Sequence, residues 1–156
     1  MMCLRKQRSD RPTGPEYTYI WIDLPDASYQ ETIDAKKLGN SLYEILGVPF
    51  SAENLNQHDI VECKDIDEVK HDFVKVVKFS GDRTVHVEFP QETNSNMWLH
   101  HIQQLENMGA DWTNSGRYFS ISLPPKSYEV MFQLIQEWER QKLLIIEVMN
   151  VSGVNE

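Results

Sequence analysis

Histidines are the side chains of this sequence best suited to metal binding or to proton transfer near neutral pH. His100 and His101 are adjacent in a stretch of helical periodicity, so they point about 100 degrees apart and cannot chelate one ion together. His58 and His71 flank an acidic stretch, but no H-x-x-x-H, E-x-x-H or EF-hand spacing supplies further ligands. We therefore expect no metal site and no bound cofactor.

His86 is the histidine with a carboxylate at a useful spacing. It lies in a stretch that alternates like a strand, two residues before Glu88, so both side chains belong to one face. A carboxylate there would orient the imidazole for acid–base chemistry, but the same spacing is equally typical of an ordinary polar strand face. An enzyme that uses His86 and Glu88 is therefore one hypothesis, and it requires an open pocket that contains both side chains.

Nucleophiles and phosphate-binding loops are not indicated by the sequence. It contains no G-x-S-x-G motif, and its seven glycines are scattered singly, so neither a phosphate loop nor a dinucleotide fingerprint can form. Cys63 has one basic neighbour, Lys64, whose side chain would point to the opposite face of a strand. Cys3 and Cys63 are not at zinc-ligand spacing and are expected to be free thiols. We therefore expect a protein that is not an enzyme.

Charge is distributed unevenly along the chain, whose formal net charge is -9. The first eleven residues hold four basic side chains against one acidic side chain, so the remaining residues carry -12. Residues 53 to 72 alone hold seven acidic side chains against two lysines. A surface of this sign repels the nucleic-acid backbone and speeds encounter with basic proteins. We expect no nucleic-acid binding by the body, and either solubilising acidic loops or an acidic docking face.

Length and composition bound the class of protein. A chain of 156 residues, 40% hydrophobic and 25% charged, predicts one globular domain or two small halves packed together. No apolar run approaches the roughly 18 residues that a membrane-spanning helix needs. The basic N-terminus is followed by prolines and a glycine instead of the apolar run of a secretory signal. We expect a cytoplasmic protein without membrane contact.

The first half of the chain is rich in strand patterns. After a flexible basic leader at residues 1–15, alternating and β-branched stretches predict strands at 17–24, 41–46, 59–64, 72–79 and 84–89. Residues 34–38 predict a helical turn that Gly39 ends. The turn residues 80–83 predict a hairpin between the last two strands. We expect residues 16–81 to form a small β-rich, barrel-like half.

The second half changes to helical periodicity. Trp98, Ile102, Leu105 and Met108 recur at helical spacing, and Gly109 is placed to end that helix at positive φ.

Further turn and cap signals complete this half. Residues 114–116 predict a turn between two strands, Ser127 predicts the cap of a second helix, and residues 143–149 predict a last strand. The order of elements predicts a ferredoxin-like βαββαβ half over residues 82–150, with 151–156 as a tail. Right-handed crossovers would put the last strand beside the first and both helices on one face. The expected fold class is α+β.

Several short motifs resemble a family of uncharacterised short bacterial proteins, in which N-x-P-F precedes G-D-x-V and a later S-G-x-x-T turn. The matching segments here are Gly47-Val48-Pro49-Phe50, His58-Asp59-Ile60-Val61 and Ser80-Gly81-Asp82-Arg83-Thr84. Gly47 stands in place of Asn and His58 in place of Gly, and the first exchange preserves tolerance of left-handed backbone. The resemblance covers residues 17–149 and implies a shared fold and a bacterial source, with no established activity.

These observations favour a binding protein over an enzyme. The first hypothesis is an immunity-type inhibitor that neutralises a basic toxin, such as a nuclease, by placing carboxylates where phosphates would bind. The acidic residues expected to steer and pair with the partner are Asp59, Glu62, Asp65, Asp67 and Glu68. The aromatic residues expected to anchor it are Phe50 and Trp112. For Trp112, packing over the sheet edge is the alternative.

The second hypothesis is a small-molecule-binding regulatory domain that acts as a homodimer. It rests on analogy, because ferredoxin-like units often pair through sheet edges and bind ligands between subunits.

Overall fold

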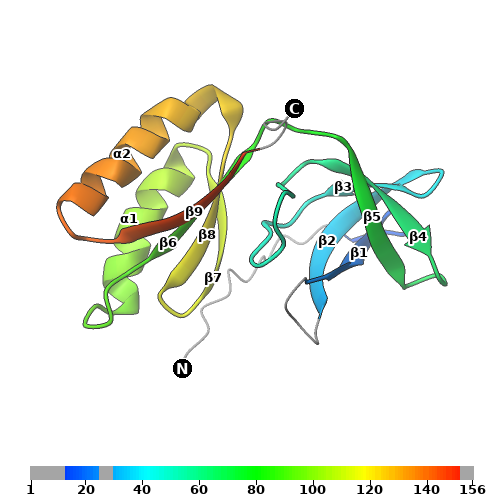
Figure 1. The fold of residues 1–156 in the computed structure, drawn as a ribbon, viewed down its shortest axis with the longest axis horizontal. Coiled ribbons are helices and arrows are strands. Elements are labelled where there is room, and N and C mark those ends of the chain that lie inside the picture. Colours follow the sequence, from blue (N-terminus) through cyan, green and yellow to red (C-terminus); the bar gives the residue numbers. More distant parts are fainter. Residues whose placement is uncertain (1–12, 25–29, 152–156) are drawn as a thin grey trace.

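The computed structural model describes residues 13–24 and 30–151. The expected leader, apart from residues 13–15, and the expected tail, apart from residue 151, lie outside the described residues. The fold is α+β, as predicted, with two parts that lie side by side along the long axis of the molecule (Figure 1). None of the helices in the described residues is long and apolar enough to cross a membrane.

The first part is a closed five-stranded barrel. Its strands are β1 (Tyr17–Asp23), β2 (Gln30–Gly39), β3 (Leu42–Ile45), β4 (Ile60–Asp65) and β5 (His71–Lys78). Neighbours along the chain pair antiparallel, and one parallel contact between β1 and β5 closes the barrel. The expected barrel-like half is thus a barrel, and its interior is filled by alternate apolar side chains, including Ile20, Ile22, Ile33, Ala35, Ile45 and Val61.

The helical turn predicted at residues 34–38 is wrong, because these residues lie in the middle of β2. Their side chains favour helix locally, but β2 pairs with β1 on one side and β3 on the other, and the closed ladder decides the conformation. The chain reverses only at Asn40 and Ser41, both at positive φ, as a two-residue hairpin turn of this twist requires.

The second part is a four-stranded sheet with two long helices. Its elements are β6 (Arg83–Glu88), α1 (Ser95–Asn107), β7 (Asp111–Ser115), β8 (Tyr118–Leu123), the short 3-10 helix η1 (Pro125–Ser127), α2 (Tyr128–Arg140) and β9 (Ile145–Val151). The strand order is β7-β8-β6-β9, with neighbours antiparallel. The last strand lies beside the first, and both helices cover one face of the sheet, as expected (Figure 1).

The ends of the two helices follow local signals to different degrees. The Asn94 side chain accepts a hydrogen bond from the backbone amide of Met97 and caps α1. Gly109 follows that helix with a φ of 107°, as predicted. Ser127 is the residue before α2, but its side chain makes no capping hydrogen bond, so the predicted Ser127 cap is wrong in that detail.

The hairpin predicted between β5 and β6 is also wrong, because the two strands belong to different sheets. The turn residues make hydrogen bonds to a barrel loop: the Ser80 amide donates to Asp59 Oδ1 at 2.8 Å, and the Ser80 hydroxyl donates to the Gln57 carbonyl at 2.7 Å. Gly81, at a φ of 92°, passes so close to Pro125 that a Cβ atom would lie 3.1 Å from the ring. This segment therefore carries the chain from one part to the other.

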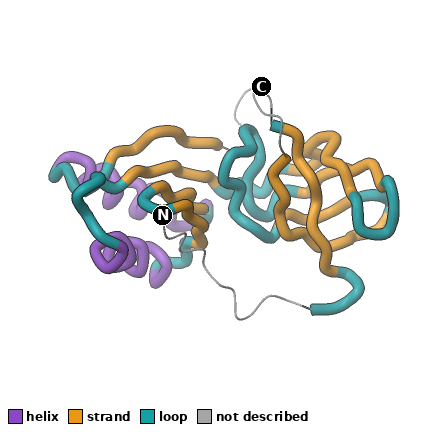
Figure 2. The backbone as a smooth tube through the Cα atoms, turned by 90° about the horizontal axis from the view of Figure 1, so that it is seen from below, coloured by secondary structure: helices purple, strands orange, loops and turns teal. Residues whose placement is uncertain are grey.

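The four-stranded sheet has one apolar and one polar face. Val85, Val87, Phe119 and Ile121 pack with the two helices in one core. The alternate residues on the same strands are polar and belong to the opposite face, among them Thr84, His86, Ser120 and Ser122. Thr84 on this face donates to Asn56 in a barrel loop, and the helices lie away from the barrel (Figure 2). A polar sheet face between two folded parts is where a site is expected.

Candidate functional site

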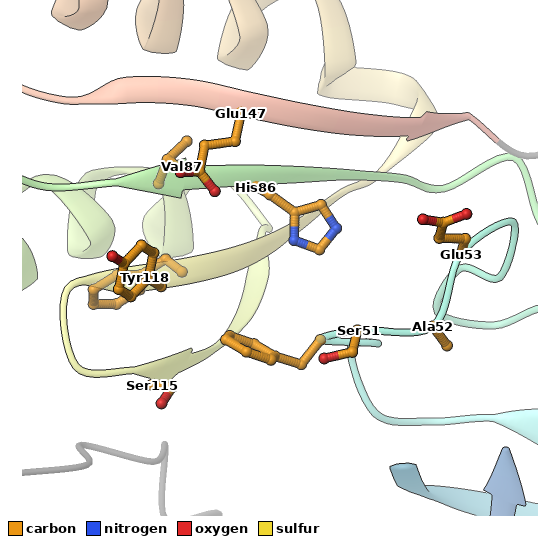
Figure 3. Close-up of a pocket in the computed structure, with 10 residues that line it drawn as sticks. Ser51, Ala52, Glu53, His86, Val87, Ser115, Tyr118 and Glu147 are labelled. Atoms are coloured by element: carbon orange, nitrogen blue, oxygen red, sulfur yellow. The ribbon is translucent and has the colours of Figure 1, made fainter. Parts of the chain in front are cut away.

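A pocket of about 330 Å³ lies between the barrel and the polar face of the sheet. One wall is the loop after β3, at residues 50–53. The other wall is the sheet, which contributes His86 from β6, Ser115 and Tyr118 from the β7–β8 hairpin, and Glu147 from β9 (Figure 3). Since the volume falls within the range of small-molecule sites and the lining mixes aromatic and polar groups, this is the candidate site.

The loop wall is held by a carboxylate from the barrel. Glu31 on β2 accepts hydrogen bonds from the backbone amides of Phe50, Ser51 and Ala52 at 2.8 to 3.2 Å. Hydrogen bonds to an ionised acceptor are stronger than those between neutral groups. This loop, which begins after the buried Pro49, is therefore fixed in place before any ligand arrives.

His86 is the central polar group of the sheet wall. Its Nδ1 lies 2.9 Å from the hydroxyl of Ser120, a residue with 0% exposure, and this contact fixes the ring. Burial lowers the pKa of His86, so the imidazole is neutral at physiological pH. Figure 3 shows the ring directed from β6 toward the loop that carries Ser51 and Glu53.

Two carboxylates line the pocket, Glu53 on the loop and Glu147 on β9. A hydrogen bond with Glu88 raises the pKa of Glu147, and partial burial adds to the effect. Glu88 also forms an ion pair with Arg117, whose guanidinium lies 4.9 Å from the ring centroid of Tyr118. No lysine or arginine is among the residues that line the pocket in the described part of the chain.

His86 and Glu88 are thus separated by the structure. His86 lines the pocket, as the enzyme hypothesis required, whereas Glu88 is held by Arg117 and Glu147 and is absent from the lining. The carboxylates that line the pocket with His86 are Glu53 and Glu147, and Glu147 lies 61 positions after His86 in the sequence.

The acidic residues expected at a docking face do not lie together. Asp59 is fully buried, and its carboxylate accepts from the backbone amides of Asn56 at 2.9 Å and Ser80 at 2.8 Å, so it holds the fold and is out of reach of a partner. Glu62 is half-buried on β4. The other three, Asp65, Asp67 and Glu68, are exposed where β4 turns into β5.

Two of those exposed acids also have roles within the barrel. Asp65 accepts from the Tyr43 hydroxyl at 2.6 Å, and this hydrogen bond lowers the pKa of Asp65. Asp67 accepts from the backbone amides of Val69 and Lys70, both at 2.8 Å, which lowers the pKa of Asp67. Both stay ionised at neutral pH, and Glu68 is the acid of this turn without a hydrogen bond among the described residues.

The two aromatic residues expected to anchor a partner have different positions. Phe50 is half-buried and lines the pocket. Trp112 is buried on β7, where its ring centroid lies 5.5 Å from that of Phe119 and its Nε1 donates to Glu106 at 2.8 Å. The structure therefore matches the packing alternative for Trp112.

The sequence reasoning missed most residues of the site, and four of them are Glu31, Glu53, Ser120 and Glu147. A signal existed for Ser120, because serines alternate with apolar residues through β8 and so mark a polar sheet face. The other three come from strands and loops that only the tertiary fold brings together. Within the described residues, no three His, Cys, Asp or Glu side chains are grouped so that they could hold a metal ion.

Fold and site together define a two-part α+β protein whose pocket lies between a closed barrel and a four-stranded sheet. The chain belongs to the family described as "Domain of unknown function (DUF4265)", whose model matches residues 31–149. The predicted membership of an uncharacterised family is thereby confirmed.

A solved structure shares this fold. The chain is similar to a hypothetical protein from Neisseria gonorrhoeae known from a crystal structure, with 19% sequence identity and a TM-score of 0.64. The match covers 91% of this chain and 99% of that chain, so the likeness extends over both parts. No curated protein matches the sequence.

Proposed function

We propose that the protein is a non-enzymatic binding module, and that the pocket between barrel and sheet is its binding site. The observation that carries this proposal is the pocket's construction from both parts, with one wall fixed by Glu31 and the other by the contact between His86 and Ser120. Pockets of small ligands are usually formed in advance and often lie where two units meet.

The chemistry of the pocket supports binding over catalysis. The hydroxyl that contacts His86 belongs to Ser120, which has no exposed surface and so cannot attack a substrate. Cys63, the described cysteine, is buried in the barrel core, and burial raises its pKa to about 12, which leaves it protonated. The hypothesis of a small-molecule-binding domain accordingly takes precedence here.

We also infer that residues 82–150 are a ferredoxin-like unit. The strand order β7-β8-β6-β9 with antiparallel neighbours supports this assignment. In this sheet β7 and β9 are the edges through which a homodimer would pair. The dimer and the cytoplasmic location stay predictions.

The test is a fragment screen against the ¹⁵N-labelled protein by NMR. We expect hits to shift the amide resonances of residues 51–53, His86, Ser115 and Glu147. The variant Ser115→Phe, which fills the pocket from the β7–β8 turn, should lose these shifts, whereas Ser95→Phe at the start of α1 should keep them. Hits that shift only resonances elsewhere, or that are unaffected by Ser115→Phe, would show that the pocket is not the binding site.

A second candidate is the inhibitor of a basic protein, supported by the exposed acids where β4 turns into β5. The variant Glu62→Lys/Glu68→Lys changes this surface without breaking a hydrogen bond among the described residues. We expect it to slow association with a basic partner captured at low salt and to flatten the salt dependence. The control Glu92→Lys/Glu129→Lys should not. If both variants associate with the partner at the same rate, the inhibitor hypothesis is wrong and the exposed acids only keep the protein soluble.

A further inference from the structure

We infer that the pocket binds a protonated amine carried on an aromatic or similarly apolar body. This inference rests on the proposed function, because it names the ligand class of the same site.

The first argument is the charge of the lining. Glu53 and Glu147 bring two carboxylates to the pocket, and the lining contains no lysine or arginine. Among the described residues, Glu53 has no hydrogen bond or ion pair. Arg117 is not among the lining residues, and its guanidinium donates to Glu88, to the Phe89 carbonyl and to the Tyr118 hydroxyl, although its charge also acts on Glu147. An anionic ligand would be repelled, and a neutral one would cover carboxylates without pairing them, which costs free energy.

The second argument is the number and placement of acceptors. In Figure 3 the carboxylates of Glu53 and Glu147 lie on opposite sides of the His86 ring, and they come from different parts of the fold. When His86 Nδ1 donates to Ser120, the other ring nitrogen is an acceptor. Glu53, Glu147 and the imidazole then offer acceptors at separate places in the lining, although Glu147 also shares a hydrogen bond with Glu88. An ammonium group has three N–H donors that diverge, whereas a guanidinium group suits one carboxylate held side on.

The third argument is the apolar part of the lining. Phe50 and Tyr118 contribute two aromatic side chains to a pocket of about 330 Å³, whereas the ring of Phe119 packs in the core on the other face of the sheet. Aromatic rings bury an apolar body and also attract a cation to their faces. Arg83 over Tyr128 and Arg117 over Tyr118 show that aromatic rings of this part already contact cations.

The experiment compares three probes of similar shape by NMR titration of the wild-type protein. The probes are 2-phenylethylamine, which is cationic at pH 7, the neutral 2-phenylethanol and the anionic phenylacetate. We expect the amine to shift the resonances of the pocket residues and to bind at least roughly tenfold more tightly than the other two. The variant Glu53→Gln/Glu147→Gln should reduce the affinity for the amine to that for the alcohol. The control Glu92→Gln/Glu129→Gln should leave it unchanged.

The outcomes separate the inference from the proposed function. If the alcohol or phenylacetate binds the pocket as tightly as the amine, the ligand class is wrong while the pocket remains a binding site. If no probe and no fragment binds there, both fail. A fourth probe, the amide of N-acetyl-Phe-Lys, distinguishes the source of the amine. Tighter binding of the peptide than of the free amine assigns the pocket to a lysine side chain of a protein, and the reverse assigns it to a small molecule.

Discussion

The hydroxyl of Thr84 on β6 donates a hydrogen bond of 2.5 Å to the side-chain oxygen of Asn56 in the barrel loop, and both residues are buried. A second bridge runs beside it, because Gln57 donates to Asp111 at 2.7 Å and to the Leu46 carbonyl at 2.8 Å. The barrel and the sheet are therefore joined by one buried and one partly buried polar contact.

The first prediction concerns the Thr84 bridge. Thr84→Val preserves the shape of the side chain but leaves the Asn56 oxygen without this donor, so we expect the free energy of unfolding to fall by about 1–3 kcal/mol. Urea denaturation followed by tryptophan fluorescence measures it. The same exchange at the exposed Thr32 on β2 is the control and should change stability by less than about 0.5 kcal/mol. If Thr84→Val and Thr32→Val change the free energy of unfolding equally, the hydrogen bond between Thr84 and Asn56 does not stabilise the protein.

The second prediction concerns the loop that Glu31 holds. Glu31→Gln replaces one acceptor oxygen by a donor and removes the charge. We therefore expect the free energy of unfolding to fall by about 1–2 kcal/mol. The amides of Phe50, Ser51 and Ala52 should exchange with solvent deuterium faster, while those of β8 are unchanged. Glu92→Gln is the control. Unchanged protection of the three loop amides in Glu31→Gln would mean that the carboxylate does not order the loop.

The third prediction is a pH dependence due to His86. Burial lowers the pKa of His86 in the folded state, so below the ordinary pKa of about 6.5 the unfolded chain binds more protons at this position. Stability contributed by the neutral ring is complete above pH 6.5 and is lost as the pH falls toward the folded pKa. We expect wild type to lose more stability than His86→Gln between pH 7 and pH 5. If wild type and His86→Gln lose equal stability between pH 7 and pH 5, the His86 ring is not buried in the folded protein.

The fourth prediction has the opposite sign and concerns His58. Its Nδ1 lies 2.6 Å from Asp82, and this hydrogen bond raises the pKa of His58, although partial burial opposes the effect. The stabilisation is present below pH 6.5 and lost as the pH rises through the folded pKa. Because the imidazole is half-exposed, we expect the charged His58 to add about 0.5 kcal/mol at most to the free energy of unfolding.

The variant His58→Asn measures this effect and tolerates the φ of 70° at that position. Its stability relative to wild type should improve as the pH rises from 5.5 to 8. A constant difference across that range would exclude a charged His58 from the stability of the folded protein.

The fifth prediction concerns the thiol of Cys63. Burial, with nearby carboxylates adding to it, raises its pKa to about 12, so little thiolate exists at pH 8. We expect iodoacetamide to leave the Cys63 peptide unmodified in the native protein and to modify it fully in urea, as read by mass spectrometry. Modification of the native protein at the rate of a free thiol would contradict the closed barrel.

Elements with strong local signals could be predicted from the sequence. The helix marked by Trp98, Ile102 and Leu105 was correct, because its local periodicity coincides with the tertiary fold. The hairpin predicted around residues 114–116 also exists, but its turn lies at residues 116–117, because Asn114 and Ser115 belong to β7. The segments at residues 34–38 and 80–83 were wrong for a shared reason. Their side chains favour a helix and a hairpin locally, but pairing across the barrel and hydrogen bonds to the loop at residues 56–59 decide their structure.

The site was harder to predict than the fold. Residues 53 to 72 read as one acidic stretch, yet Glu53 lies in the pocket, Asp59 is buried, and Asp67 and Glu68 are exposed in the turn between β4 and β5. Charge along the chain does not reveal which carboxylates the backbone uses as acceptors. His86 lies in the pocket lining, but Ser120, which contacts its ring, and Glu147, which lines the same pocket, come from other strands.

The chain passes from the barrel to the sheet in the segment between β5 and β6. During synthesis all five barrel strands therefore emerge from the ribosome before β6 does, and the barrel can close while the rest of the chain is still being made. Asn56 and Gln57 can make their hydrogen bonds to Thr84 and Asp111 only after those residues have been synthesised. Because Glu147 on β9 lines the pocket, the complete pocket can form only after β9 has joined the sheet.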